Sequence, residues 1–212
     1  GRAILERLLA GESCALVTDA GTPAISDPGE DLVRLCAENG VEVLSIPGCC
    51  AAVNALAVSG LPTGRFTFEG FLSVNKKARR EHLTSLLEED RTMIFHEAPH
   101  KLLTTLEDLA AAFGPDRPVA LCRELTKLHA ETIRTTLGQA ADRWRDTAPK
   151  GEFVLVVAGR PPRQEAAITV EEAVEQVLAL RDGGMRLKDA VRQVAIDTGL
   201  SKNELYAAAL ER

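Results

Sequence analysis

Three charged side chains follow the ends of predicted strands. Glu97 follows the strand predicted for 92–96, and Glu124 and Lys127 follow the strand predicted for 118–122. The ends of strands are where α/β enzymes place their working groups. A carboxylate there can accept a proton from a weak nucleophile, and a cation can stabilise the developing negative charge, with rate effects of about 10²- to 10⁴-fold. These three residues are therefore candidate catalytic groups, and the sequence leaves the choice of base among them open.

A polar loop near the start of the chain has the composition of a ligand site. Residues 19–29 are rich in Gly, Pro, Asp, Ser and Thr, and the loop is longer than the roughly two to six residues of an ordinary strand-to-helix connection. Gly21 lets the backbone approach a ligand closely, while Pro23 and Pro28 stiffen the segment. The loop predicts binding of a small molecule, with a structural Ω-loop as the alternative.

The segments around this loop alternate between strand and helix patterns. Apolar and β-branched residues predict buried strands at 14–18, 41–46 and near residue 68. Apolar residues at helical spacing, with Gly40 and Gly60 as stop signals, predict helices at 1–10, 30–39 and 51–59. Alternation of this kind indicates a parallel α/β sheet.

A second α/β region follows, with more antiparallel character. Its predicted helices are 81–89, 101–113 and 137–144, and its predicted strands are 92–96, 118–122, 130–135 and 153–158. We place the boundary near residues 72–76, which gives an N-terminal α/β domain at 1–74 and a second α/β domain at 75–160. A ligand cleft is expected between two such domains.

The end of the chain has a helical pattern throughout. Residues 160–165 form a linker by composition, and 163–212 predict three short helices with capping boxes at Thr169–Glu172 and Ser201–Glu204. This pattern predicts a helix-turn-helix-like tail. The tail carries seven Lys and Arg against nine Asp and Glu, whereas a DNA reader usually presents a basic face. We therefore interpret it first as a packing or substrate-orienting module and second as a nucleic-acid contact.

Composition restricts the class of protein. A net charge of −6 argues against a protein that coats nucleic acid through a general positive field. No apolar run approaches the roughly 18 to 20 residues of a membrane span, and no signal peptide is visible. Five cysteines without a C-x-x-C pair favour reduced, cytoplasmic thiols over disulfides or zinc. The four histidines show no ligand spacing with Cys or paired carboxylates, so no metal is predicted.

One dense cationic run interrupts this acidic chain. Lys76, Lys77, Arg79 and Arg80 lie just after the strand predicted near residue 68. The run fits either a solvated helix start or a local nucleic-acid contact. Aromatic residues make up only 4% of the chain, so any such contact would depend on phosphate and shape more than on base stacking.

A series of motifs connects these features. The loop itself is Thr18-Asp-Ala-Gly-Thr-Pro-Ala-Ile-Ser-Asp-Pro-Gly29. In order along the chain follow Ile46-Pro-Gly48 with Ala51-Ala52, Ser59-Gly-Leu-Pro62, Phe68-Glu-Gly-Phe-Leu72, Thr92-Met-Ile-Phe95 with Glu97 and Pro99-His100, Arg123-Glu-Leu-Thr-Lys127 and Lys150-Gly-Glu152. Together they resemble the ribosomal RNA small-subunit methyltransferase I family of the tetrapyrrole methylase superfamily. The resemblance covers residues 1–160 closely and the last fifty loosely.

The sequence also departs from the family pattern. His96 stands where Tyr is usual, Lys101 where Arg is usual and Cys49 where Pro is expected. We expect His96 to fill the Tyr space at a strand end, and His100 is a weak candidate for the base. An earlier Gly-Asn-Leu turn and an Ala-Glu-Asp-Thr-Arg strand end of the family do not occur here, so we expect the first domain to be incomplete at its start.

The resemblance implies two α/β domains of the tetrapyrrole methylase type with a ligand cleft between them, plus a small C-terminal helical module. It implies S-adenosylmethionine as methyl donor and the 2′-hydroxyl of a cytidine in small-subunit (16S) ribosomal RNA as acceptor, in a cytoplasmic homodimer. Methyl transfer requires donor and acceptor in line, and positioning can supply about 7 to 11 kcal/mol of the barrier.

The site residues follow from these implications. The residues expected along the donor are Asp19, Ala20, Gly21, Thr22, Ile25, Ser26, Pro47, Gly48, Ala51 and Ala52. The alternative explanation of the small pair Ala51-Ala52 is a helix packed tightly on a sheet. The residues expected on RNA are Lys76, Lys77, Arg79, Arg80 and Arg123, and Lys127 is a further candidate for a phosphate contact. Arg123 and Glu124 also fit a surface salt bridge.

Two other functions remain open at this point. A methylase of a tetrapyrrole precursor would share the fold and the donor, but the 123–127 and 68–72 motifs favour the RNA enzyme. A non-catalytic nucleic-acid-binding regulator built on residues 163–212 is the second, and the acidic balance of that tail counts against it.

Overall fold

The computed structural model describes residues 1–161 and 168–211. They fall into two compact units, Gly1–Pro161 and Pro162–Arg212. The predicted start of the helical tail at residue 163 lies beside this division, among residues outside the described range. No helix in the described ranges is long and apolar enough to cross a membrane.

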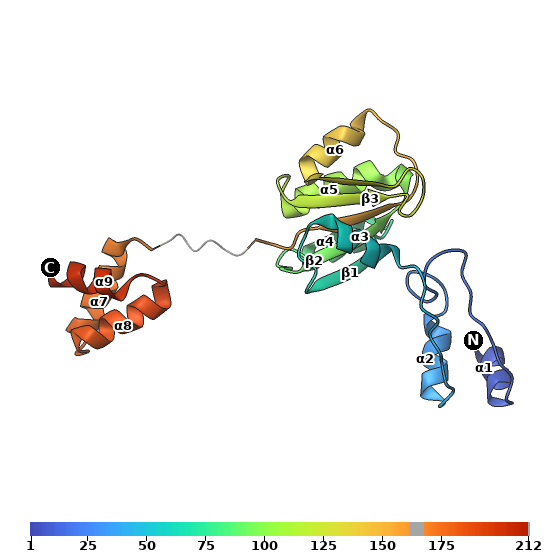
Figure 1. The fold of residues 1–212 in the computed structure, drawn as a ribbon, viewed down its shortest axis with the longest axis horizontal. Coiled ribbons are helices and arrows are strands. Elements are labelled where there is room, and N and C mark those ends of the chain that lie inside the picture. The colour runs from blue at the N-terminus through green and yellow to red at the C-terminus, as the bar shows by residue number, and fades with distance from the viewer. Residues whose placement is uncertain (162–167, 212) are drawn as a thin grey trace. The chain divides into compact units, whose positions relative to one another are not determined.

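The first unit is built on a five-stranded mixed sheet with the strand order β1-β2-β5-β3-β4 (Figure 1). The strands are β1 Phe66–Phe71, β2 Thr92–Glu97, β3 Pro118–Arg123, β4 Glu131–Thr136 and β5 Phe153–Val157. β1 and β2 are parallel, while β5 runs antiparallel to both β2 and β3, and β3 runs antiparallel to β4. The antiparallel character expected after residue 75 is therefore confirmed.

The predicted domain boundary at residue 74 falls inside this sheet. β1 ends at Phe71 and pairs directly with β2, so the ladder joins residues on both sides of the boundary. The compact unit extends to Pro161 without a division there. The separation into 1–74 and 75–160 stays a prediction.

One face of the sheet carries the larger core. It is covered by α4 Lys76–Ser85, α5 Leu102–Phe113 and α6 Leu137–Arg145, with the 3-10 turn η1 Pro99–Lys101 leading into α5. Met93, Phe95, Leu121 and Leu155 are fully buried there. The predicted helix at 81–89 in fact begins at Lys76, because the Asn75 side chain accepts hydrogen bonds from the amides of Lys77 and Ala78 and so caps the first turn.

The opposite face is covered by α3, Ala51–Ser59. Ala52, Ala55 and Leu56 of this small-residue helix pack on alternate residues of β2, β3 and β5, and we call this side of the sheet the α3 face. α3 ends at Gly60 with φ of 79°, as its sequence predicts. Arg134 of β4 donates hydrogen bonds to the carbonyl oxygens of Ser59 (3.1 Å) and Val58 (2.5 Å), which places a cation at the negative end of the helix dipole.

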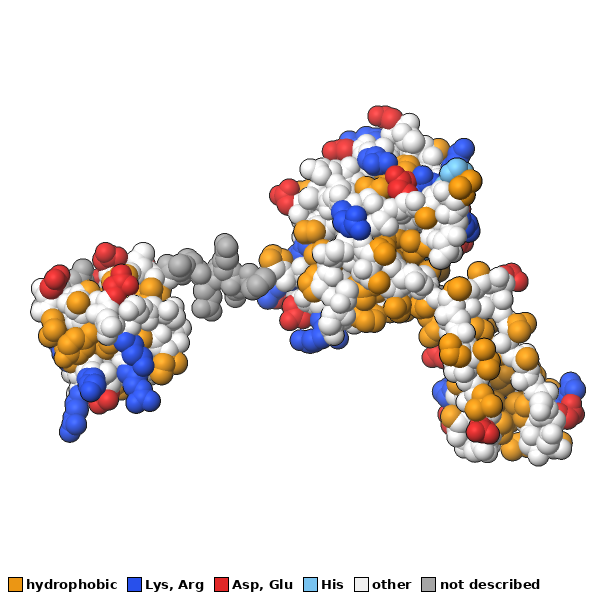
Figure 2. All heavy atoms as spheres, viewed as in Figure 1, with side chains coloured by type: hydrophobic (Ala, Val, Ile, Leu, Met, Phe, Trp, Pro, Cys, Tyr) orange, Lys and Arg blue, Asp and Glu red, His pale blue; other side chains and the backbone are white. Residues whose placement is uncertain are grey.

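The N-terminal part corrects two predicted strands. α1 Arg2–Leu9 and α2 Glu30–Glu38 form as expected, but 14–18 and 41–46 have no strand assignment. A strand needs hydrogen bonds from a neighbour, and no strand in the described ranges pairs with either segment. Their apolar side chains are exposed instead, Val17 at 81% and Ile46 at 83%. Figure 2 shows hydrophobic side chains gathered on the surface of this part of the chain.

The second unit contains α7 Val170–Asp182, α8 Leu187–Thr198 and α9 Lys202–Leu210 around a small apolar core. The capping box at Thr169–Glu172 is confirmed, with hydrogen bonds in both directions. The second predicted box is wrong, because Ser201 precedes α9 without a side-chain capping bond.

Candidate active site

The end of β2 sends two titratable side chains to opposite faces of the sheet. Side chains alternate along a strand, so His96 lies on the same side as Ile94, the α3 face. Glu97 lies on the same side as Phe95, the face covered by α5. His96 and Glu97 are therefore neighbours in the sequence that lie in different environments.

Glu97 is held inside a hydrogen-bond network. Its side chain is 2% exposed and accepts bonds from the Ala98 amide (2.9 Å) and from the Thr105 hydroxyl (2.5 Å). Thr105 in turn accepts a bond from Arg79 (2.8 Å), and Arg79 forms a 2.5 Å ion pair with Asp108. These contacts join β2, α5 and α4. They support a structural role for Glu97, and its catalytic role stays a prediction.

The network gives a stability prediction. Thr105→Val removes the hydroxyl at nearly constant volume, so buried Glu97 loses a donor and Arg79 loses an acceptor. An unsatisfied buried group costs about 1–3 kcal/mol, and we expect the free energy of unfolding to fall by that amount in urea denaturation. Thr104→Val is the matched control, because Thr104 is exposed on the same helix. Equal stability of the two variants would show that the network contributes nothing.

His96 occupies an aromatic niche at the corresponding end of the α3 face. Phe68 and Phe71 of β1 contact its ring edge-on, with centroids 5.2 and 5.5 Å away. Its Nε2 atom is buried and has no hydrogen-bond partner in the described chain. Burial lowers the pKa of His96 below its ordinary value of 6.5, and the nearby negative charge of Glu152 partly opposes the shift. His96 is thus a neutral ring at neutral pH.

A folded-state pKa below the unfolded value fixes the sign of a pH effect. The unfolded chain binds a proton on His96 more readily than the folded chain does. The contribution of neutral His96 to folding stability is therefore complete above pH 6.5 and declines as the pH falls below that value. We expect His96→Phe, which keeps an aromatic ring in the niche, to lose less stability between about pH 7.5 and 5.5 than the wild type. Urea denaturation across this range measures the difference. Parallel pH profiles for the two proteins would contradict the burial of a neutral imidazole.

The loop at 19–29 lies against both the start of α3 and the end of β1. The Thr22 hydroxyl donates to the Cys49 carbonyl (3.1 Å), next to the first residues of α3. A Cβ atom placed on Gly70 would lie 3.7 Å from Ser26 Oγ, so the loop approaches β1 between Phe68 and Phe71. Ala24 and Ser26 both have positive φ, at 64° and 58°. Strained backbone of this kind gathers at ligand sites.

The predicted donor residues are accessible from solvent with few exceptions. Asp19, Ala20, Gly21, Ser26, Pro47, Gly48 and Ala51 are exposed, as is half of Ile25, while Thr22 is partly buried. Ala52 is buried against the sheet, so this member of the Ala51-Ala52 pair packs as a core residue. The Thr22 contact brings the loop to Cys49, which follows Gly48 and precedes α3, and the donor role of these residues stays a prediction.

The 123–127 loop follows β3 and also reaches the α3 face through Leu125. Glu124 and Thr126 have positive φ of 52° and 67°. The Lys127 ammonium lies 3.3 Å from the Glu124 carboxylate, so the two predicted catalytic groups form an ion pair. A Cβ on Gly151, which has φ of 79°, would approach Glu124 Oε1 to 2.5 Å, so this glycine lies directly against the Glu124 carboxylate and joins the 123–127 and 150–152 motifs in one place.

The cationic residues differ in how far their side chains are exposed and paired. Lys76, Lys77 and Arg80 are exposed at the start of α4, with Lys77 3.8 Å from Glu81. Arg79 instead points into the Glu97 network and is 13% exposed. Arg123 pairs with Glu131 at 2.7 Å, whereas the salt-bridge alternative paired it with Glu124, whose carboxylate contacts Lys127 instead. The sequence places Arg79 with its cationic neighbours, because its partner Asp108 lies 29 residues away on α5.

The structure therefore assembles a site that the sequence described in pieces. The 19–29 loop contacts the segment before α3 and the end of β1, while the Phe68–His96–Phe71 niche and Leu125 of the 123–127 loop lie on the α3 face. Sequence reasoning treated His96 as a space-filling strand end and missed its unpartnered nitrogen. Met93, Ile94 and Phe95 form a continuous apolar run, so the sequence alone did not indicate which face of the sheet His96 would take. Among the described residues, no group of three or more His, Cys, Asp or Glu is arranged to hold a metal ion.

Comparison with known proteins identifies the family. A family model described as Tetrapyrrole (Corrin/Porphyrin) Methylases matches residues 1–141, and one described as RsmI C-terminal HTH domain matches residues 168–212. The protein is 45% identical over 208 residues to the ribosomal RNA small subunit methyltransferase I of Synechocystis, a match that covers 98% of this chain and 75% of the relative. The chain belongs to the ribosomal RNA small subunit methyltransferase I family. The Haemophilus influenzae relative is 44% identical, covering 98% of this chain and 74% of its own length.

Solved structures confirm the fold of this small-subunit methyltransferase I family member. The methyltransferase CobJ matches with a TM-score of 0.52 at 22% identity, covering 74% of this chain and 69% of CobJ. Cobalt precorrin-4 methyltransferase CbiF matches with a TM-score of 0.51 at 20% identity, covering 73% of this chain and 68% of CbiF. The predicted fold class, α/β of the tetrapyrrole methylase type with a C-terminal helical module, is confirmed.

Proposed function

We propose that this protein is an S-adenosylmethionine-dependent methyltransferase that methylates the 2′-hydroxyl of a cytidine in 16S ribosomal RNA. The observation that carries the proposal is the 45% identity to a ribosomal RNA small subunit methyltransferase I along 98% of the chain. Its proposed partners are small-subunit RNA or the particle that contains this RNA. The proposed site of the methylation reaction is therefore the cytoplasm. The protein acts as a homodimer in this proposal, and sedimentation analysis tests that part.

The donor is proposed to lie along the 19–26 loop and the first turn of α3. Space is available, because a Cβ on Gly48 would meet nothing within 4 Å and one on Gly21 would meet only the Cys49 carbonyl, at 3.9 Å. The Thr22–Cys49 bond holds the loop to the segment before α3. A bound donor supplies a methyl group on a positively charged sulfur, and the protein's part is to orient it and exclude water.

Acceptor activation is proposed for Glu124 and Lys127. A 2′-hydroxyl is a weak nucleophile, so a carboxylate that takes its proton or an ammonium that stabilises the alkoxide speeds attack. The 3.3 Å contact holds the Lys127 ammonium beside the Glu124 carboxylate, and both residues stand on a strained loop that touches the α3 face. Lys76, Lys77 and Arg80 are proposed to hold RNA phosphates, since all three are exposed on one short stretch of α4.

The function is tested by supplying the protein with methyl-labelled S-adenosylmethionine and small ribosomal subunits from cells that lack the gene. We expect label on a cytidine 2′-oxygen of 16S RNA, located by the resistance of the adjacent phosphodiester to alkali. Label on a base, or on a tetrapyrrole precursor offered in the same assay and not on RNA, would overturn the proposal.

A further inference from the structure

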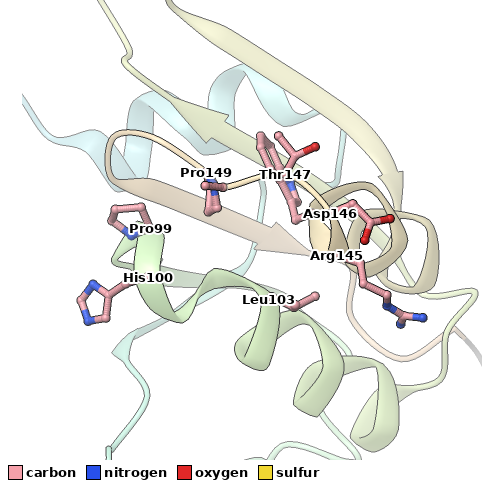
Figure 3. Close-up of a pocket in the computed structure, with 9 residues that line it drawn as sticks. Pro99, His100, Leu103, Arg145, Asp146, Thr147 and Pro149 are labelled. Carbon is pink, nitrogen blue, oxygen red and sulfur yellow. The ribbon is translucent and has the colours of Figure 1, made fainter.

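A cavity of about 370 Å³ opens on the α5 side of the sheet, outside the candidate active site on the α3 face. Figure 3 shows its two walls. One is the turn and first helical residues that follow β2, with Pro99, His100 and Leu103. The other is the end of α6 and the loop after it, residues 144–149. The volume lies within the range of about 300–1,000 Å³ that is usual for small-ligand sites.

The walls combine flat apolar surface with polar groups. Pro99, Leu103 and Pro149 supply apolar surface, and His100, Arg145 and Thr147 supply hydrogen-bonding side chains. Trp144, which is 8% exposed, also lines the cavity, and its indole nitrogen has no hydrogen-bond partner among the described residues. Such a mixture suits a nucleotide, which presents a flat ring together with sugar and phosphate oxygens.

Basic and acidic side chains are balanced around the cavity, and Arg145 is the cation in its wall. Arg145 lines it, and the lysines Lys101 and Lys150 directly follow the lining residues His100 and Pro149. Asp146 is the acidic side chain in the wall, while Glu107 and Asp142 contact Arg145 at 3.7 and 3.4 Å. The Arg145 side chain is still 58% exposed, so its guanidinium remains reachable from solvent.

The cavity is linked to the candidate active site through one short segment. Pro149 lines the cavity, and Gly151, two residues later, packs against the Glu124 carboxylate. On the other wall, Pro99 and His100 come one residue after the end of β2, where His96 faces the Phe68–Phe71 niche. An RNA strand that presents one nucleotide to Glu124 and Lys127 therefore passes close to the cavity.

We propose that this cavity binds a second nucleotide of the substrate RNA, a neighbour of the methylated cytidine in a single-stranded segment. Arg145 contacts its phosphate, and its base lies between the proline-bearing walls. The cavity thereby fixes which nucleotide of the strand reaches the reacting position. This inference rests on the proposed function, because it takes the substrate to be RNA.

The cavity contains its own reporter. Trp144 is the single tryptophan of the chain, so intrinsic fluorescence reports entry of a ligand beside it. The probe is hexacytidylate RNA, titrated at several salt concentrations between about 0.05 and 0.2 M. We expect a saturable change in Trp144 emission, and an emission unchanged by RNA that binds the protein, as judged by fluorescence anisotropy of labelled RNA, would overturn the proposal.

Two variants separate the effect of cavity shape on RNA binding from the effect of the Arg145 charge. Ala148→Phe fills the cavity from its exposed loop, and Arg145→Gln removes the proposed phosphate contact. Both should weaken hexacytidylate binding about tenfold, in keeping with the loss of one stacked or phosphate-held nucleotide. Only Arg145→Gln should flatten the slope of log K against log salt, by about 0.7.

Arg34→Gln is the matched control, because the Arg34 side chain is also 58% exposed and also pairs with two acids, Asp31 and Glu38. It should bind RNA as the wild type does. Wild-type affinity in both cavity variants would overturn the proposal. If the wild type transfers methyl groups to small subunits and the cavity variants do so equally well, the cavity inference fails while the proposed function stands. If the wild type transfers no methyl group to RNA, the proposed function fails whatever the fluorescence shows.

Discussion

Gly21→Val is expected to abolish measurable binding of S-adenosylmethionine, lowering affinity by at least about 100-fold, while the protein stays folded. Gly21 has φ of 78°, a conformation that a β-branched residue adopts only with strain, so valine forces the loop backbone to move. The proposed donor contacts are chiefly backbone groups of this loop, and they are lost when it moves. Titration calorimetry gives the affinity, and circular dichroism confirms that the variant is folded.

Gly40→Val is the matched control for this experiment. Gly40 has φ of 70° and open space around the position of a Cβ atom, so it carries a similar backbone strain away from the loop. A comparable loss of stability in both variants, with donor affinity lost only in Gly21→Val, assigns the effect to the site. Donor binding that survives in folded Gly21→Val would place the ligand elsewhere.

The second large effect is expected at the Glu124–Lys127 pair. Lys127→Met and Glu124→Gln remove charge at nearly constant volume, and we expect at least one of them to lower the rate of methyl transfer by about 100-fold with donor affinity unchanged. The reason is that a group acting on the acceptor oxygen works in the transition state and not on the bound donor. Single-turnover methylation of small subunits measures the chemical step, and calorimetry measures donor affinity.

Two comparisons make the test specific. Glu38→Gln removes a carboxylate from an exposed ion pair on α2 and should leave the rate unchanged. If Glu124 and Lys127 act as one unit, the double variant should be no slower than the slower single variant. Wild-type rates in both single variants would leave positioning as the source of catalysis, and a parallel loss of donor affinity would assign the residues to the cofactor site.

Local signals in the sequence predicted most of the fold. The stop at Gly60, the capping box at Thr169 and the strand at 118–122 depend on neighbouring residues, and all three are present. The segments 14–18 and 41–46 have equally strong strand composition but no strand assignment, because pairing depends on a distant partner that composition does not reveal. Ser201 has the sequence of a capping residue, yet its side chain makes no capping bond.

The candidate site was predictable as motifs and not as geometry. The motifs placed Gly21, Ser26 and Glu124 in loops, where the structure finds them. Nothing local separates Arg79 from Arg80, since the difference arises from Asp108 and Thr105 on α5. In the same way, consecutive residues of a strand always take opposite faces, but which helices cover the His96 face and the Glu97 face depends on packing between distant segments. Long-range pairing decides which charged residues are free to act.

The position of β5 has a consequence for synthesis. β5 is the last strand of the sheet in chain order, yet it lies at the centre, between β2 and β3. A nascent chain that ends before Phe153 holds two half-sheets, β1-β2 and β3-β4, whose inner edges are unpaired and open to other chains. The sheet closes only when residues 153–157 have left the ribosome, so folding of the first unit waits for nearly its whole length. Ribosomes stalled just before and just after this strand should therefore carry chains that differ sharply in protease resistance.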